Sequence, residues 1–204
     1  MSNPIDKFFL FIERSFLFRL ADRILDAIFT FFQILFMPER HRKGTQAEIF
    51  VDEFLFPEKN YDMLHRTVDY QTNKWRRVKD SSLPDFRFRD RANGSEFWVE
   101  VKYRSEWKGD KEDEYIDFLD EEYKLERYKE IDKELPVFIA ICTGHTSLDP
   151  AESFLIPVRF IKLSDRIYRK YLLPFQTHTQ DQTLDELDIS VSSESLWKRL
   201  NQIK

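Results

Sequence analysis

Two short segments of alternating apolar and polar residues, joined by a tight-turn signal, constrain the fold of this chain more than any other feature. Two phenylalanines alternate with charged residues in 85–90, and apolar and polar residues alternate again in 96–103. Alternation with a period of two predicts strands, because successive side chains of a strand point to opposite faces. Asn93 and Gly94 lie between the segments, and this dipeptide favours a hairpin turn. The sequence therefore predicts an antiparallel β-hairpin.

The other apolar patterns place helices and further strands around this hairpin. Residues 136–142 form a continuous apolar run, which is typical of a central strand buried on both faces. Strands are also expected at 61–67 and at 154–158, where Pro157 indicates a sheet edge. Helices are expected from Thr45 to the residue before Pro57, around 125–135, over 160–173 and over 195–202. These elements predict an α/β protein, a three-layer α/β/α sandwich with a mixed central sheet.

The composition agrees with a globular protein. Of 204 residues, 42% are hydrophobic and 34% are charged, which excludes a collagenous, low-complexity or wholly disordered chain. The single cysteine, Cys142, excludes an intramolecular disulfide and a multi-cysteine zinc site, and a small buried core residue is its expected role. The sequence has no secretory-signal pattern and no apolar run of the ~20 residues that a membrane span needs. We expect a cytoplasmic protein without a stable membrane span.

Residues 1–40 are expected to form a helical extension rich in phenylalanine. Polar residues recur every three to four positions between 19 and 33 and leave most of the helix surface apolar. Such a helix needs cover on more than one side. Three interpretations stay open, namely packing across the domain, a homodimer interface, or adsorption to a membrane surface. The last is the least favoured, because the polar stripe carries charges of both signs.

The charge is unevenly distributed along the chain. The net charge is −5, from 32 basic and 37 acidic residues, which excludes a uniformly basic nucleic-acid-coating protein. Residues 66–91 hold eight Lys/Arg and four Asp, a net of +4, whereas 100–134 hold eight Lys/Arg and fourteen Asp/Glu, a net of −6. The basic segment, with one aromatic residue among its cations, either tracks phosphates or is an ordinary solvated loop. The predicted contacts within it are Lys74, Trp75, Arg76, Arg77 and Arg87.

Three polar residues of the hairpin have the types that phosphodiester chemistry requires. Glu100 and Lys102 are two positions apart and point to the same face of the second strand, and Asp85 begins the first strand. Two carboxylates at one place repel each other unless a cation lies between them. Mg²⁺ is bound by one or two carboxylates while it keeps waters and substrate phosphate oxygens. A metal and a lysine beside a phosphate are the elements of phosphodiester hydrolysis.

These residues also resemble a family signature. Pro84-Asp85, a gap of fourteen residues and Glu100-x-Lys102 resemble the motif of the PD-(D/E)xK nuclease superfamily, which has the restriction-endonuclease-like fold. That family commonly adds an acidic residue on a preceding helix, and Glu48 fits this position. The resemblance covers about residues 43–160, within a nuclease-like domain that we place at 41–175, followed by a tail at 176–204 with one short helix.

The resemblance implies a mechanism and a substrate. Asp85, Glu100 and Glu48 would hold Mg²⁺ (or Mn²⁺), and Lys102 would align the attacking water and stabilise the charge on phosphorus. Nucleic acid would be the substrate, with DNA expected ahead of RNA. By the same resemblance Lys124 would contact the substrate, whereas core packing is the expected role of Tyr128.

Each of these residues also has a simpler interpretation. Glu100 and Lys102 could form a solvated ion pair on an exposed strand face, although Trp98 on the same face is unusual there. Asp85 could serve a turn after Pro84. Glu48 could be a capping-box glutamate that bonds to the Thr45 amide, in which case Asp52 would replace it as the metal ligand.

Two other classes of function stay open. The chain could be a catalytically inactive module of the same fold that binds nucleic acid or assists assembly. It could instead act through its N-terminal helix in oligomerisation or at a membrane surface. ATP-driven chemistry is not expected, because the sequence has no glycine-rich phosphate loop. The four histidines have no metal-binding spacing and receive no role.

Overall fold

The computed structural model describes residues 39–67, 83–117, 122–162, 166–179 and 189–201. The chain divides into two compact units, Met1–Arg42 and Lys43–Lys204. The N-terminal extension falls outside the described residues up to position 38, as do Lys74, Trp75, Arg76 and Arg77. No helix in the described ranges is both long and apolar enough to cross a membrane.

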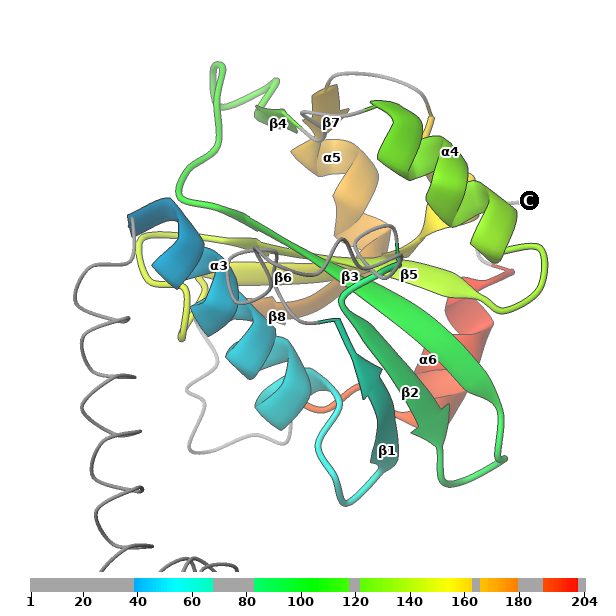
Figure 1. Cartoon of the computed structure of the whole chain (residues 1–204). Coiled ribbons are helices and arrows are strands. Elements are labelled where there is room, and N and C mark those ends of the chain that lie inside the picture. Colours follow the sequence, from blue (N-terminus) through cyan, green and yellow to red (C-terminus); the bar gives the residue numbers. More distant parts are fainter. Residues whose placement is uncertain (1–38, 68–82, 118–121, 163–165, 180–188, 202–204) are drawn as a thin grey trace, which may run out of the picture. The chain divides into compact units, whose positions relative to one another are not determined.

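A six-stranded mixed sheet forms the centre of the second unit (Figure 1). In spatial order its strands are β1 (Tyr61–Arg66), β2 (Phe86–Asp90), β3 (Glu96–Arg104), β5 (Val137–Thr143), β6 (Glu152–Pro157) and β8 (Gln176–Thr179). Strands β3 and β5 are parallel, and every other neighbouring pair is antiparallel. A second, two-stranded sheet pairs β4 (Tyr115–Asp117) with β7 (Arg166–Tyr168). The predicted mixed α/β class is confirmed.

The predicted hairpin is formed by β2 and β3. Its register places Phe86 opposite Val99 and Arg89 opposite Glu96. The turn ends at Gly94, whose φ of 74° lies in the left-handed region that glycine adopts without strain. The alternating pattern therefore gave the correct strands and the correct turn.

The helices differ from the prediction at two places. They are α3 (Glu39–Phe50), α4 (Glu122–Ile131), α5 (Arg169–Leu172) and α6 (Ser193–Arg199), with a π-helical turn η1 (Val51–Leu55) and the 3₁₀ turns η4 (Val158–Phe160) and η5 (Leu173–Phe175). Helix α3 is already helical at Glu39, so the expected start at Thr45 is wrong. The helix expected over 160–173 is also wrong, because β7 and the single-turn α5 occupy that region.

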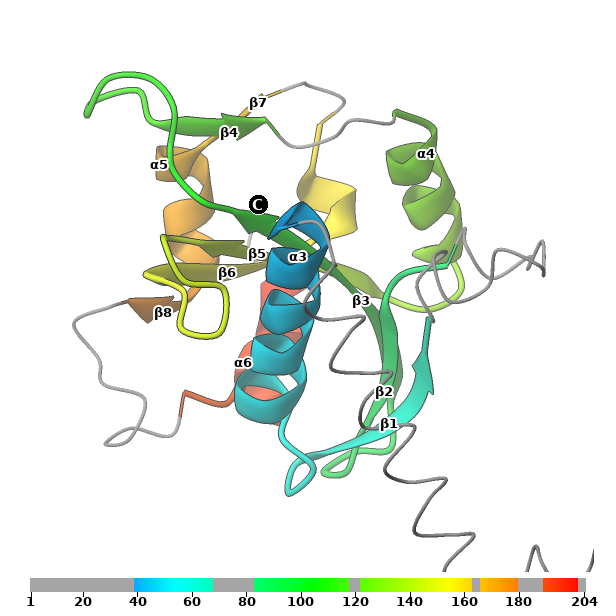
Figure 2. The ribbon, with the colours of Figure 1, turned by 60° about the vertical axis from the view of Figure 1, so that its left-hand side comes forward.

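Apolar side chains of the sheet pack against helices on both faces, and Figure 2 shows α3 and α6 together on one side. Phe86 and Phe97 belong to one buried cluster, which includes Phe50 of α3 and Leu196 of α6. Trp98 belongs to the other, which includes Leu125 and Tyr128 of α4 and Leu172 of α5. The core position expected for Tyr128 is confirmed. Because odd and even residues of β3 enter different clusters, the face of every β3 side chain is determined.

Strand β5 is buried along its whole length, as its apolar run predicts. Cys142 lies within it, and burial raises the pKa of its thiol to about 12. The edge position expected from Pro157 is wrong, because β6 lies between β5 and β8. However, β8 pairs only with Glu152, Ser153 and Phe154, so it does not reach Pro157. The missing N–H of proline is therefore tolerated beyond the end of β8.

Candidate active site

The start of β2 and the middle of β3 bring Asp85, Glu100 and Lys102 together. Asp85 directly precedes β2, and its Oδ2 accepts a hydrogen bond from the backbone N–H of Val101 at 2.7 Å. The ammonium group of Lys102 donates to Glu100 Oε1. Glu100 and Lys102 share the face of β3 that also carries Trp98, on the side of the sheet covered by α4. The three residues named from the sequence form one cluster.

Hydrogen bonds from Thr67, the residue that follows β1, position Asp85. The backbone N–H of Thr67 donates to the carbonyl of Asp85 at 2.8 Å. The Thr67 hydroxyl donates to the carbonyl of the buried Pro84, also at 2.8 Å. Proline fixes its own φ, so these two bonds and the Val101 amide bond hold the Pro-Asp segment in one conformation. The aspartate therefore has a structural reason to be rigid, which suits a ligand residue better than a solvated turn residue.

The cluster holds more negative than positive charge. Burial and the neighbouring Glu100 carboxylate raise the pKa of Asp85 well above its usual value, whereas Lys102 and the Val101 amide act in the opposite direction. Glu100 is only 4% exposed, so water screens this repulsion weakly. Two carboxylates face one ammonium group, a formal charge of −1. A bound cation would remove the repulsion that the single lysine leaves.

The burial also decides between two interpretations of Glu100 and Lys102. A solvated pair on an exposed strand face requires exposed side chains, but that of Glu100 is 5% exposed and that of Lys102 is 19% exposed. Trp98 beside them is buried. The interpretation as an ordinary solvated surface pair is therefore wrong, and the pair lies in the low-dielectric environment that makes charge interactions strong.

Glu48 lies next to this cluster but is bound elsewhere. Its Oε2 forms an ion pair with Nη2 of Arg66 at 3.0 Å. The capping-box interpretation is wrong, because α3 is already helical six residues before Thr45. The Glu48 charge nevertheless contributes to the raised pKa of Asp85. Asp52, the alternative ligand, lies on η1, where burial raises its pKa and Arg66 lowers it.

The described residues contain no complete group of three or more His, Cys, Asp or Glu side chains that could hold a metal ion. The carboxylates that the structure brings together at the hairpin are Asp85 and Glu100, and Glu48 is paired with Arg66. A site of this kind suits Mg²⁺ or Mn²⁺ better than zinc, because hard cations keep several waters and need only one or two protein carboxylates.

Two of the residues predicted to contact nucleic acid are described. Arg87 lies on β2, where its guanidinium group is bound to Glu96 and stacks 5.7 Å from the ring centre of Trp98. Lys124 lies in the first turn of α4 and is partly buried. Arg87 is therefore held against the sheet by Glu96, a carboxylate that it shares with Arg89. The other predicted contacts lie outside the described residues.

Arg66 and Thr67 were not predicted as residues of the site. Arg66 ends β1 and is paired with Glu48, and Thr67 follows it and is hydrogen-bonded to Asp85. Arg66 was counted only as the first member of the basic segment. Its position became visible through the strand register, which places Arg66 opposite Phe86. No local pattern reveals which residues of β1 face Asp85, because β1 contains a register shift between Met63 and His65.

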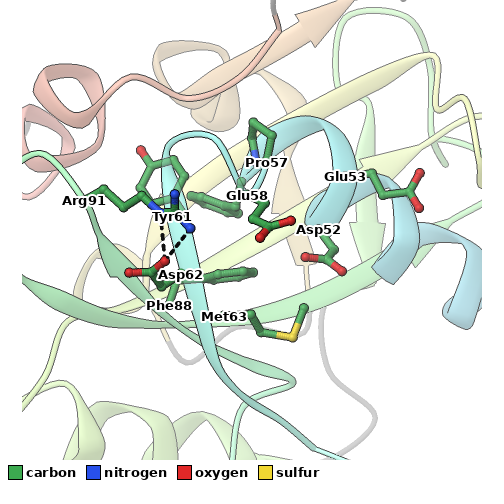
Figure 3. A pocket seen from close by; sticks show the side chains of 10 residues that line it. Asp52, Glu53, Pro57, Glu58, Tyr61, Asp62, Met63, Phe88 and Arg91 are labelled. Carbon is green, nitrogen blue, oxygen red and sulfur yellow. Dashed lines mark hydrogen bonds and ion pairs between the residues drawn. The ribbon is translucent and has the colours of Figure 1, made fainter.

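A separate cavity of about 520 Å³ opens between η1 and β1 (Figure 3). Its charged lining is Asp52, Glu53, Glu58, Asp62 and Arg91. Arg91 is the one cation of this lining and is paired with Asp62 at 2.6 Å. Asp85, Glu100 and Lys102 do not line it. A cavity with four carboxylates repels phosphate, so the cavity is not a candidate site for a nucleic-acid backbone.

No family model matches this chain, and no curated protein matches it either.

Proposed function

We propose that this protein is a metal-dependent nuclease that hydrolyses phosphodiester bonds, with DNA as its substrate. The observation that carries the proposal is the placement of Asp85 against Glu100, with Lys102 bound to the same glutamate. We also propose that the helices on both faces of the sheet make up the three-layer α/β/α sandwich of the restriction-endonuclease-like fold. The residues of the cluster then resemble the PD-(D/E)xK motif in spatial arrangement as well as in sequence.

The two carboxylates fit a divalent cation. Among the described residues, the Val101 amide donates to Asp85 Oδ2 and Lys102 donates to Glu100 Oε1, which leaves the second oxygen of each carboxylate for a metal. Mg²⁺ or Mn²⁺ would supply an activated water and a Lewis acid for the phosphoryl oxygen. The excess negative charge of the cluster favours such a cation electrostatically. Glu48 would assist from the side of α3.

Lys102 is suited to hold the attacking water. Its ammonium group has three hydrogen-bond donors, and the bond to Glu100 uses one of them. The side chain is 19% exposed, so it is held by its surroundings but still accessible to a substrate. The remaining donors can orient a water and a phosphate oxygen together. A fixed positive charge beside the phosphate also stabilises the negative charge that develops in the transition state.

The first test is cleavage of supercoiled plasmid with Mg²⁺ or Mn²⁺, compared with an EDTA control. We expect Lys102→Ala to lose at least about 100-fold in nicking rate, the usual cost of removing a charge-stabilising donor. Lys133→Ala is the matched control, because Lys133 is an exposed lysine paired with Glu130. It should cleave at the wild-type rate.

Three results would separate the alternatives. Equal cleavage by wild type and Lys102→Ala would show that the cluster is not the catalytic centre. Metal-dependent DNA binding without cleavage would favour the inactive nucleic-acid-binding module. The absence of both would remove the nuclease proposal for DNA, and the same assays on RNA and branched DNA would then decide whether another nucleic acid is the substrate.

A further inference from the structure

The ion pair between Glu48 and Arg66 lies on the α3 side of the sheet, at the start of β2, next to Asp85. Arg66 is the last residue of β1 and is paired in the sheet with Phe86, the neighbour of Asp85. Its guanidinium group lies 5.3 Å from the ring centre of Phe86 and 3.0 Å from the Glu48 carboxylate. The next residue, Thr67, is hydrogen-bonded to the Asp85 carbonyl. Arg66 is therefore fixed by the same backbone that fixes the proposed metal ligand.

We propose that Arg66 contacts a phosphate of the nucleic acid and that Glu48 holds it in place until metal and substrate bind. This inference rests on the proposed nuclease function and adds a substrate-positioning residue to it. When a cation occupies Asp85 and Glu100, Glu48 turns toward that cation, and Arg66 takes the phosphate in exchange. The ion pair between Glu48 and Arg66 is thus replaced by a contact between Glu48 and the cation and a contact between Arg66 and the phosphate.

The exposure of the two side chains permits this exchange. The side chain of Arg66 is 41% exposed and that of Glu48 is 24% exposed, so neither is locked in the core. An ion pair at this exposure contributes little to stability, and breaking it costs correspondingly little. Guanidinium binds phosphate through two parallel hydrogen bonds, which gives it a geometric preference for this new partner.

Electrostatic attraction favours the exchange once a cation is bound. Glu48 is bound to Arg66, which lies opposite Phe86, the neighbour of Asp85, so a cation at the cluster attracts the Glu48 carboxylate. Asp52 is the second acidic group that acts on Arg66. When Glu48 binds the metal, its negative charge no longer balances the positive charge of Arg66. Arg66 then attracts a phosphate more strongly. Metal binding and nucleic-acid binding therefore strengthen each other, and this coupling is reciprocal.

The matched control is the ion pair between Asp62 of β1 and Arg91, which follows β2, at 2.6 Å. Arg91 is about as exposed as Arg66, 46% against 41%, while Asp62 is more exposed than Glu48, 40% against 24%. Arg91→Ala and Asp62→Asn thus remove the same charges as Arg66→Ala and Glu48→Gln, but away from Asp85. Any general effect of net charge on DNA binding appears equally in both pairs.

DNA binding is measured by fluorescence anisotropy of a labelled duplex in EDTA and in Ca²⁺, with the duplex checked on a gel for integrity. We expect Arg66→Ala to weaken binding in Ca²⁺ about tenfold and to reduce the slope of log K against log salt by about 1. Glu48→Gln should tighten binding in EDTA about threefold more than Asp62→Asn, because it releases Arg66. Arg91→Ala should produce neither the tenfold loss of DNA affinity nor the reduced salt slope that we expect of Arg66→Ala.

Metal binding gives a second readout that does not depend on cleavage. Titration with Mn²⁺, followed by electron paramagnetic resonance of the free ion, should show tighter binding by Arg66→Ala and weaker binding by Glu48→Gln. If the ion pair only connects α3 to β1, the two variants should bind Mn²⁺ with the affinity of wild type. Arg66→Lys keeps the charge and loses the planar fork, so it replaces Arg66→Ala if thermal unfolding shows that the alanine variant does not fold.

The outcomes separate this inference from the proposed function. If wild type cleaves DNA but Arg66→Ala and Arg91→Ala have the same affinity and the same salt slope, the role of Arg66 is overturned and the nuclease proposal stands. If wild type binds neither Mn²⁺ nor nucleic acid, both are overturned. A salt slope reduced only by Arg66→Ala, together with opposite effects of the two variants on Mn²⁺ affinity, supports the exchange.

Discussion

At the scale of single residues, the cluster of Asp85, Glu100 and Lys102 holds two carboxylates whose charges destabilise the protein. Asp85 and Glu100 repel each other in a poorly solvated place, and one lysine compensates only part of that repulsion. Strain of this kind is common at functional sites, because a group placed for chemistry is seldom placed for stability. The stability of the metal-free protein therefore reports on the cluster directly.

The variant Asp85→Asn should stabilise the metal-free protein. An asparagine side-chain oxygen can still accept the hydrogen bond from the Val101 amide, while the repulsion with Glu100 disappears. We expect a gain of about 1 kcal/mol, or an increase in melting temperature of a few degrees. The measurement is thermal unfolding in EDTA and in Mg²⁺. Mg²⁺ should stabilise wild type and not the variant, and a lower melting temperature of the variant in EDTA would refute the repulsion.

His178 should make the fold sensitive to mild acid. It is buried on β8, where loss of hydration lowers the pKa of its imidazole below the usual value. A histidine with a lowered pKa in the folded state takes up its proton more readily when unfolded. The stability that comes from neutral His178 is therefore present above about pH 6.5 and is lost as the pH falls below that value.

The corresponding measurement is urea unfolding of wild type and His178→Phe at pH 7 and pH 5. Wild type should lose about 1 kcal/mol more than the variant between these two values. An equal loss in both proteins would mean that His178 does not contribute to acid sensitivity.

At the scale of secondary-structure elements, the hairpin turn and α6 are joined through one buried carboxylate. Asp90, the last residue of β2, accepts hydrogen bonds from the Ser193 hydroxyl at 2.5 Å and from the Trp197 indole N–H at 2.7 Å. Its other oxygen accepts from the backbone N–H of Ala92 at 2.9 Å. With an exposure of 1%, its oxygens have little access to replacement partners in water.

Removing this carboxylate should destabilise the protein. We expect Asp90→Ala to reduce the free energy of unfolding by about 3 kcal/mol, because three donors lose their acceptor, two of them partly buried side chains. Asp113→Asn is the control, since Asp113 is 67% exposed and paired with Lys170 on the surface. It should change stability by less than about 0.5 kcal/mol. Urea unfolding compares the two, and similar midpoints would contradict a structural role of Asp90.

The elements also show how far local sequence patterns determine this fold. The hairpin was predictable because its alternation and its Asn93-Gly94 turn act over a few residues. The strands β4, β7 and β8 were not predicted, since three or four residues are too few to show a period. Residues 160–173 have helical spacing, but pairing with β4 and packing into the core overrode it. The weak pattern at β1 was sufficient to predict a strand.

The candidate site was predictable to the same extent. Asp85, Glu100 and Lys102 come from two neighbouring strands, so the hairpin alone brings them together. Arg66 and Glu48 come from elements distant in sequence, and their pairing depends on how α3 crosses the sheet. Thr45-x-x-Glu48 resembled a helix start, yet the helix begins earlier, so this local signal was misleading.

At the scale of the whole molecule, the described core clusters lie entirely in the second unit. Their members run from Ala47 to Leu200, and α6 completes one of them with the buried Leu196. Arg199 is also buried and donates hydrogen bonds to the carbonyls of Leu155, Phe175 and Gln176. The segment expected to be a tail thus supplies a strand, a helix and several core contacts.

Deletion experiments should therefore give asymmetric results. A chain that lacks residues 1–38 should keep one cooperative thermal transition, because none of the described core residues is removed. A chain that lacks 189–204 should lose it, because Leu196 and Arg199 are gone. Circular dichroism follows both transitions. Cooperative unfolding without 189–204, or its loss without 1–38, would contradict this division. Solution mass and liposome flotation of the first chain also test the dimer and membrane-surface interpretations of the extension.

The proposed function requires Asp85 and Glu100 to share a divalent cation. Anomalous X-ray diffraction from a crystal of the wild-type protein soaked in Mn²⁺ locates such a cation. We expect one strong anomalous peak in contact with an oxygen of each carboxylate, and its loss in crystals of Asp85→Asn. A peak elsewhere that persists in Asp85→Asn, or no peak beside Glu100, would rule out a shared cation.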